Sequence, residues 1–122
     1  MKPNDVREGP SQRQLRVGEE LRHALSEILN RGDSNEPELF DVSITVTEVR
    51  VSPDLRNATV FVMPLGGKDL GPIMEALKRT KPFFRHQVAK ELKNLRNVPD
   101  LRFEADNSFD TSKRIDDILK NI

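Results

Sequence analysis

Eight lysine and arginine side chains lie between residues 78 and 102 of a chain whose total charge is zero. The same stretch holds only two acids, Glu91 and Asp100, so it carries a local excess of six positive charges. Such an excess must be neutralised by acids elsewhere in the protein or be offered to a polyanion, and nucleic acid is the commonest polyanion. We therefore predict RNA contacts from Lys78, Lys81, Arg85, Lys90, Lys93, Arg96 and Arg102.

The acids of the chain are concentrated in a different place. Between residues 33 and 55 there are six acids and one base, Arg50. If this acidic segment folds over the basic stretch, the positive charge is neutralised within the protein. If the two lie on opposite faces, the molecule has a polarity that would orient it on a polyanion. The sequence leaves both arrangements open.

Residues suited to catalysis or to metal binding are few. The two histidines, His23 and His86, fall in predicted helices, and neither lies in a recognisable nucleophile motif. No Walker-type or dinucleotide-type glycine loop is present, and the absence of cysteine excludes disulfides and thiolate metal sites. The four aspartates after residue 105 have a spacing that suits helix capping and solvated turns. We predict a protein without catalytic residues, cofactor or metal.

The bulk composition supports one globular domain. A chain of 122 residues is long enough to bury roughly two thirds of its unfolded surface in one core. The first residues are polar and proline-containing, so we predict a disordered lead over residues 1–11 and a single domain over residues 12–122. No apolar run approaches the ~18 residues that span a bilayer. We therefore predict a cytoplasmic protein with no membrane partner.

The elements that position the basic side chains follow from the spacing of apolar residues. Apolar side chains between residues 17 and 29 recur with helical spacing and predict a first helix from near Ser11 to Gly32. Residues 32–39 are polar and turn-forming, which predicts a loop. The chain then changes to the alternating pattern of strands.

Two strands and a turn follow. Alternating apolar residues predict a strand over residues 42–51, with a bulge near Glu48 where the alternation changes phase. A second β-rich run covers residues 57–63. Ser52-Pro53-Asp54 lies between them and has turn chemistry, so we predict an antiparallel hairpin.

The basic stretch covers a pair of helices and a third strand. Residues 70–77 predict a short helix, and Thr80-Lys81-Pro82 predicts a break before a second helix that runs from Pro82 to about Leu95. Residues 101–105 alternate as a third strand, and a last helix begins near residue 108 or 110. Three short strands cannot close a barrel, so their apolar face must be covered by helices. The predicted fold is a two-layer α+β domain with the order α-β-β-α-α-β plus a C-terminal helix.

The second helix of the pair offers the most specific geometry. Along it, Arg85, Ala89, Lys93 and Arg96 would share one flank, where a small alanine between long cations lets a sugar-phosphate backbone approach. The alternative is that these cations simply cover the solvated face of the helix. Phe83, beside the break, is the aromatic side chain with a chance of exposure for stacking on a base.

Five separated segments of the sequence resemble the ribosome-binding factor A family. They occur in the family's order and together cover about residues 11–120. They are RQLRVGEEL (residues 13–21), VRVSPDLRNATVFV (49–62), FRHQVAKEL (84–92), VPDLRF (98–103) and SKRIDDIL (112–119).

This resemblance implies a KH-like domain of type II and a bacterial assembly factor that has no catalytic activity or cofactor. Such a factor binds the immature small (30S) ribosomal subunit, contacts 16S rRNA and supports its late maturation, including the 5′ end region. The family matters most in the cold. The resemblance also implies a monomer off the ribosome.

The resemblance also identifies the break between the paired helices as a site of interest. A typical KH domain clamps nucleotides with a GXXG loop at this place. The ribosome-binding factor A family has an Ala-x-Gly kink there, and this sequence has Thr80-Lys81-Pro82. RNA contact would then depend on side chains such as Lys81, Arg85 and Lys93. The alternative function is a KH-like protein–protein adaptor that uses the acidic loop or a hairpin edge.

Overall fold

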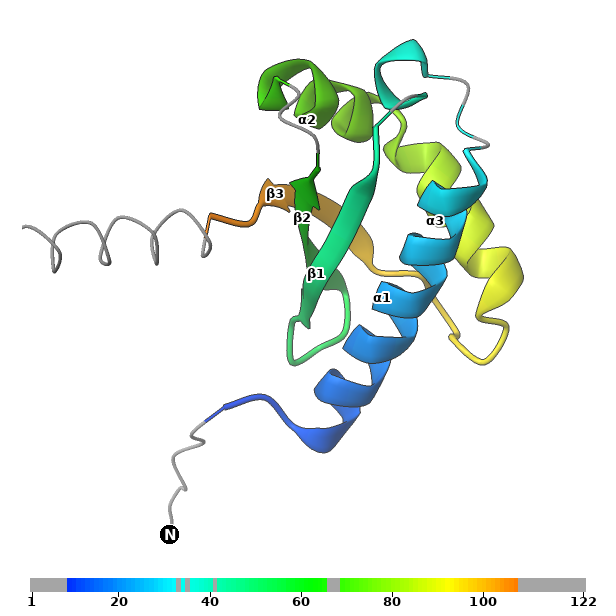
Figure 1. Ribbon diagram of the computed structural model, residues 1–122. Coiled ribbons are helices and arrows are strands. Elements are labelled where there is room, and N and C mark those ends of the chain that lie inside the picture. The colour runs from blue at the N-terminus through cyan, green and yellow to red at the C-terminus, as the bar shows by residue number, and fades with distance from the viewer. Residues whose placement is uncertain (1–8, 33, 35, 41, 66–68, 108–122) are drawn as a thin grey trace, which may run out of the picture.

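The computed structural model describes residues 9–32, 34, 36–40, 42–65 and 69–107. The predicted order α-β-β-α-α-β is confirmed, with a 3-10 helix added in the loop after the first helix. The predicted C-terminal helix and residues 1–8 of the predicted lead lie outside the described residues. The elements are α1 (Gln12–Arg31), η1 (Pro37–Leu39), β1 (Ile44–Val51), β2 (Asn57–Pro64), α2 (Leu70–Arg79), α3 (Lys81–Glu91) and β3 (Asp100–Ala105) (Figure 1).

Helix α1 begins and ends as its sequence predicts. The Ser11 hydroxyl accepts a hydrogen bond from the Gln14 N–H at 3.1 Å, and the Gln14 side chain accepts one from the Ser11 N–H at 2.8 Å. This reciprocal pair is a capping box, which satisfies amide donors that the first turn leaves unpaired. Gly32 ends the helix with a φ of 69°, a left-handed conformation that glycine adopts without strain.

The sheet has the order β1-β2-β3. Strands β1 and β2 form the predicted antiparallel hairpin, and their register shifts between Val46 and Glu48, which confirms the predicted bulge. Strand β3 pairs with the other edge of β2 in parallel. This direction follows from the helices α2 and α3, which carry the chain back across the sheet as parallel pairing requires.

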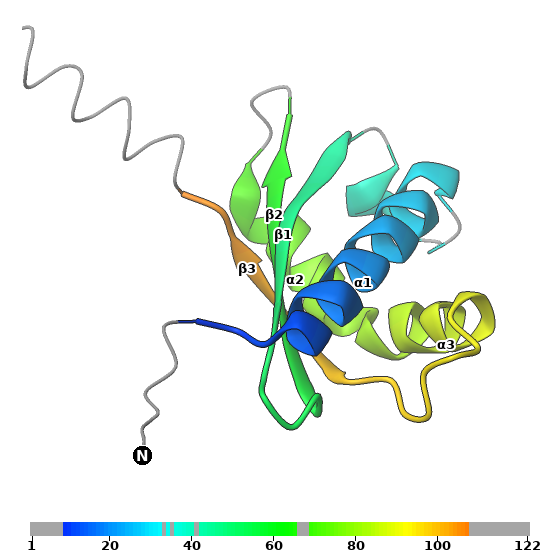
Figure 2. The ribbon, with the colours of Figure 1, turned by 90° about the horizontal axis from the view of Figure 1, so that it is seen from below.

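One face of the sheet is buried, and the other is open in the part of the chain that the structure describes. Val60, Val62 and Phe103 point into the core with exposures of 0–2%, whereas Arg50 and Arg102 lie on the opposite face and are exposed. Helices α1 and α3 lie on the same side of the sheet (Figure 2), and α2 packs against β3. The predicted two-layer arrangement is therefore confirmed.

Helix α1 and strand β1 approach each other closely. The Gln14 side-chain amide donates to the Val51 carbonyl oxygen at 2.8 Å. One turn further along, a Cβ at Gly18 would lie only 2.7 Å from the Val49 carbonyl oxygen. A glycine at this position thus lets the helix lie directly on the strand.

The prediction for the second paired helix was partly wrong. The break at Thr80 is confirmed, because Thr80 ends α2 and precedes α3. However, α3 ends at Glu91 and does not continue to Leu95, since Leu92 leaves the helical region with φ −111° and ψ 72°. Leu92 and Leu95 still pack partly against the core. Their helical spacing reflects burial of a folded-back loop, not a continued helix.

Candidate nucleic-acid interface

The residues predicted to contact RNA fall on three separate parts of the surface. Two lie at the α2–α3 junction (residues 78–82), most of the others lie on α3 or in the α3–β3 loop (residues 92–99), and one lies on the open face of the sheet. All are exposed except Lys81, which is half-buried. In this order they are Lys78 and Lys81, then Arg85, Lys90, Lys93 and Arg96, then Arg102.

An open groove runs between α3 and the α3–β3 loop, and we call it the α3 groove. It is lined by three of the predicted cations, Arg85, Lys93 and Arg96, and also by Ala89 and His86. The prediction that these cations share a helical flank was wrong, because Lys93 and Arg96 lie beyond the end of α3. The loop folds back and brings them to the same groove.

Arg85 connects α3 to this loop. Its Nη2 donates to the Val98 carbonyl oxygen at 3.0 Å, and its Nε lies 3.3 Å from the Pro99 carbonyl oxygen. A guanidinium has five N–H donors, so these two bonds leave others for a ligand. Arg85 therefore holds the wall of the groove while its charge remains at the surface.

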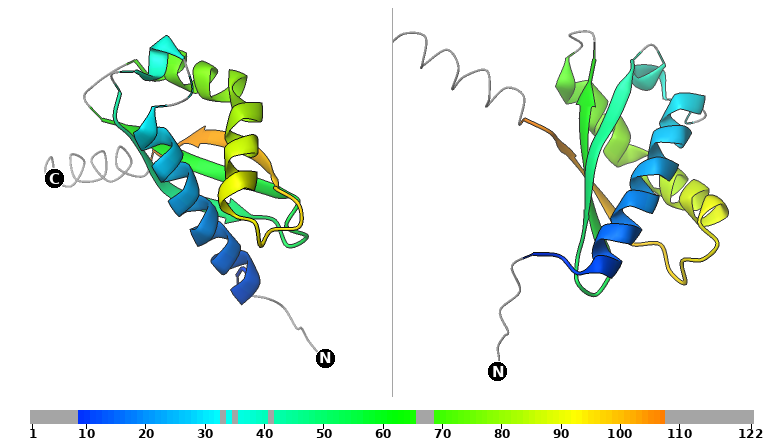
Figure 3. Two further views of the ribbon diagram at one scale, coloured as in Figure 1. Left: turned by 90° about the vertical axis from the view of Figure 1, so that its right-hand side faces the viewer. Right: turned by 60° about the horizontal axis from the view of Figure 1, so that its bottom comes forward.

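A second groove, the arginine groove, lies on the other side of the same loop. Four arginines from four segments line it: Arg13 from α1, Arg56 from the hairpin turn, Arg85 from α3 and Arg96 from the loop. Figure 3 shows the loop and the hairpin turn at the same end of the molecule. Sequence reasoning missed Arg13 and Arg56, because both lie far along the chain from the basic stretch.

Local hydrogen bonds position Arg56. Asp54 accepts a hydrogen bond from the Ser52 hydroxyl at 2.6 Å and one from the Arg56 N–H at 3.1 Å. The Ser52 hydrogen bond contributes most to lowering the pKa of Asp54, and the nearby charge of Arg56 adds to it. Asp54 forms no ion pair within 4 Å among the described residues, and its charge offsets only part of the positive charge of the four arginines that line the groove.

The acidic segment neutralises a cation at the α2–α3 junction instead. Arg79 donates from Nε to Glu36 at 2.9 Å and from Nη2 to both Glu36 and Glu38. The hydrogen bond with Glu36 is the main cause that raises the pKa of Arg79. In the part of the chain that the structure describes, no ion pair joins Lys93 or Arg96 to an acid.

The cations on the open face of the sheet are paired within their own strands. The Nε of Arg102 lies 2.7 Å from Glu104, and the Nε of Arg50 lies 2.8 Å from Glu48. The Arg50 guanidinium also stacks over the Phe61 ring at 5.1 Å from its centroid. The structure therefore separates Arg102 from the other predicted RNA-binding residues.

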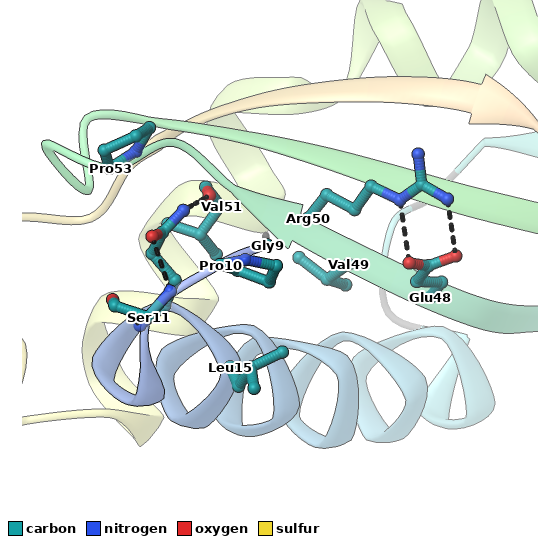
Figure 4. Close-up of a pocket in the computed structure, with 10 residues that line it drawn as sticks. Gly9, Pro10, Ser11, Leu15, Glu48, Val49, Arg50, Val51 and Pro53 are labelled. Atoms are coloured by element: carbon teal, nitrogen blue, oxygen red, sulfur yellow. Dashed lines mark hydrogen bonds and ion pairs between the residues drawn. The ribbon is translucent and has the colours of Figure 1, made fainter. Parts of the chain in front are cut away.

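A further groove between the start of α1 and strand β1 is mainly apolar (Figure 4). Pro10, Leu15 and Val49 line it, and Leu15 is 53% exposed. Its cation, Arg50, is the one paired with Glu48. This groove lacks the unpaired positive charge that a polyanion requires.

The aromatic residue predicted for base stacking is not well exposed. Phe83 is half-buried, and its ring packs edge-on against Phe84 with centroids 5.4 Å apart. Among the described residues, the exposed large hydrophobics are Leu15, Phe40 and Leu65. None of them lines either basic groove. The grooves are thus suited to phosphates more than to stacked bases.

The described residues contain neither a metal-binding cluster nor a membrane-spanning helix. Over residues 9–107, apart from the undescribed positions, no group of three or more His, Cys, Asp or Glu is placed to hold a metal ion. No helix in the same residues is both long enough and apolar enough to cross a bilayer.

Comparison with known proteins decides the family. A family model described as ribosome-binding factor A matches residues 13–119. The chain belongs to the ribosome-binding factor A family. A family member from Paramagnetospirillum magneticum is 61% identical over 112 residues, which is 92% of this chain and 78% of the relative.

Solved structures of the family have the same fold. The crystal structure of ribosome-binding factor A from Thermus thermophilus matches with a TM-score of 0.62 at 26% identity, over 75% of this chain and 94% of that one. A homology model of the Thermus thermophilus factor, fitted into a cryo-EM map of a 30S complex, matches with a TM-score of 0.60 at 26% identity, over 74% and 91% of the two chains. The predicted KH-like α+β fold is confirmed.

A substitution at Arg85 tests whether its two carbonyl bonds hold the α3–β3 loop against α3. Replacing Arg85→Lys keeps the charge but removes the planar fork that bonds two carbonyls. We expect the free energy of unfolding in urea to fall by about 1 kcal/mol, with faster amide exchange at Leu95. The control Lys90→Arg changes an exposed α3 cation and should stay within about 0.5 kcal/mol. Equal stability of both variants would show that the two carbonyl bonds do not hold the loop.

Proposed function

We propose that this protein is a non-catalytic ribosome assembly factor that binds the immature small ribosomal subunit through phosphates of its 16S rRNA. Membership of the ribosome-binding factor A family supports this proposal, as does the relative fitted into a 30S complex. The observation that carries the docking mode is the set of cations around the α3–β3 loop. Lys93 and Arg96 have no acidic partner among the described residues, so a polyanion can bind them without displacing an internal ion pair.

The resemblance to the family extends the proposal to a role in the cell. We propose that binding supports late maturation of 16S rRNA, including its 5′ end region, with the greatest need in the cold. The readout is the level of unprocessed 16S rRNA in a strain that lacks the chain, compared at low and ordinary growth temperatures. Equal processing at both temperatures would remove this part of the proposal.

Charge reversal tests the docking mode. The double variant Lys93→Glu, Arg96→Glu should weaken co-sedimentation with immature small subunits by roughly thirtyfold or more, because it removes two phosphate contacts and adds repulsion. The matched control is Arg22→Glu, Arg50→Glu, which changes the net charge equally at cations already paired with Glu19 and Glu48. We expect the control to bind within about threefold of the parent. Equal loss in both variants would mean that total charge, not this surface, governs binding.

The adaptor alternative is less well supported by the geometry. Two of the three acids it would use, Glu36 and Glu38, are engaged by Arg79 and would have to leave it to bind a partner, and the third, Asp41, lies outside the described residues. An adaptor also predicts subunit or protein binding that survives nuclease treatment. Such survival, together with loss on neutralising Glu36, Glu38 and Asp41, would favour the adaptor.

A further inference from the structure

The two ends of α3 differ in charge balance. At the α2–α3 junction, Arg79 is bonded to Glu36 and Glu38, whereas Lys78 and Lys81 form no ion pair within the described residues. At the other end, five cations surround the α3–β3 loop and two acids line the same grooves. The cations are Arg13, Arg56, Arg85, Lys93 and Arg96, and the acids are Asp54 and Asp100. The larger group of cations without a bonded acid among the described residues thus lies at the C-terminal end of α3.

The α3 groove and the arginine groove share a wall. Both are lined by Arg85 and by residues 95–98 of the α3–β3 loop. Arg96 therefore borders both grooves, with Lys93 on one side and Arg13 and Arg56 on the other. A chain of regularly spaced phosphates could pass from one groove over the loop to the other and meet a cation on each side.

Gathering cations from distant segments in one place has a cost in free energy unless a ligand neutralises them. The guanidinium groups of Arg13 and Arg96 make no hydrogen bond or ion pair among the described residues, and that of Arg56 makes none within 4 Å. Planar guanidinium forks match phosphate oxygens well. The same site lacks an exposed aromatic side chain and so is a poor match for an apolar peptide.

We propose that the RNA backbone crosses the α3–β3 loop at the C-terminal end of α3, with Arg13 and Arg56 as phosphate ligands, and does not dock at the α2–α3 junction. This inference rests on the proposed function for its natural ligand. In it, Arg85 holds the loop through two carbonyl bonds and keeps further N–H donors for a phosphate, while Arg96 faces both grooves. The docking site then includes α1 and the hairpin turn, which carry no part of the basic stretch.

Two double variants, each of which removes two positive charges, test which end of α3 binds RNA. Arg13→Gln, Arg56→Gln removes cations of the arginine groove, and Lys78→Gln, Lys81→Gln removes cations of the junction. Affinities of the full chains for small subunits and for a protein-free 16S rRNA fragment are measured over a range of salt. We expect the groove variant to lose about tenfold or more and to reduce the slope of log K against log salt by about 1.4–1.8. The junction variant should lose less than about threefold, with its slope unchanged.

Each outcome decides the inference. A larger loss in the junction variant, or equal losses in both, overturns it. Thermal unfolding checks that both variants are folded, which we expect because none of the four side chains forms a hydrogen bond or an ion pair within 4 Å in the described structure. If the parent binds the rRNA fragment through the groove but not the subunit, the inference stands and the proposed function fails. If the parent binds neither RNA, or its subunit binding resists salt and nuclease, the groove is not an RNA site.

Discussion

Raising the salt concentration fourfold is expected to weaken binding to small ribosomal subunits by about one hundred to five hundredfold. The estimate takes the five cations around the α3–β3 loop as phosphate contacts, each contributing a slope of about −0.7 to −0.9 in log K against log salt. Released counterions drive this term, so it depends on the number of contacts and not on the rRNA sequence. The measurement is a binding isotherm at four or more concentrations of monovalent salt, with Mg²⁺ held constant to keep the subunit intact.

The charge-reversal variant provides the control for the salt dependence of binding. The variant Lys93→Glu, Arg96→Glu should show a slope smaller by about 1.4–1.8, since two of the contacts are gone. A parent slope shallower than about −2 would be too small for five phosphate contacts and would contradict the docking mode, even if binding were tight.

Replacing Gly18→Ala is expected to lower the free energy of unfolding by about 2 kcal/mol, although alanine is the better helix former by about 1 kcal/mol. The added Cβ would lie 2.7 Å from the Val49 carbonyl oxygen, which belongs to the backbone of a paired strand. That oxygen can move only if α1 or β1 moves. The destabilisation corresponds to a fall in melting temperature of roughly 10 °C.

Gly71→Ala is the matched control. It also lies in a helix, but the nearest atom to its added Cβ would be an Asp69 side-chain oxygen at 3.8 Å, an ordinary contact. This variant should be neutral or more stable by up to about 1 kcal/mol. Similar melting temperatures for the two variants would show that α1 can lift from β1 at little cost.

Local patterns predicted most of the elements because their causes are local. Ser11 and Gly32 bound α1 through bonds to residues within one turn, and the Ser52-Pro53-Asp54 turn closes the hairpin through its own side chains. The bulge near Glu48 showed as a change of phase in the alternation. In each case the residues that decide the structure are neighbours in the sequence.

The end of α3 shows where local patterns mislead. Leu92 and Leu95 have the spacing of a helix, yet they reach the core from a loop. Burial in the core requires an apolar side chain, and both a helix and a loop can place such a side chain there. The direction of β3 likewise depends on where the helix pair returns the chain, which no residue of β3 encodes.

The amino-acid sequence by itself determined most of the elements, the two-layer α+β class and the excess of positive charge between residues 78 and 102. Only the tertiary structure decided which of these charges are unpaired and where they gather. It pairs Arg79 with Glu36 across 43 residues of sequence and brings Arg13 and Arg56 beside Arg96. The physical reason is that charges interact through space, so a count along the chain can locate an excess but not its partners.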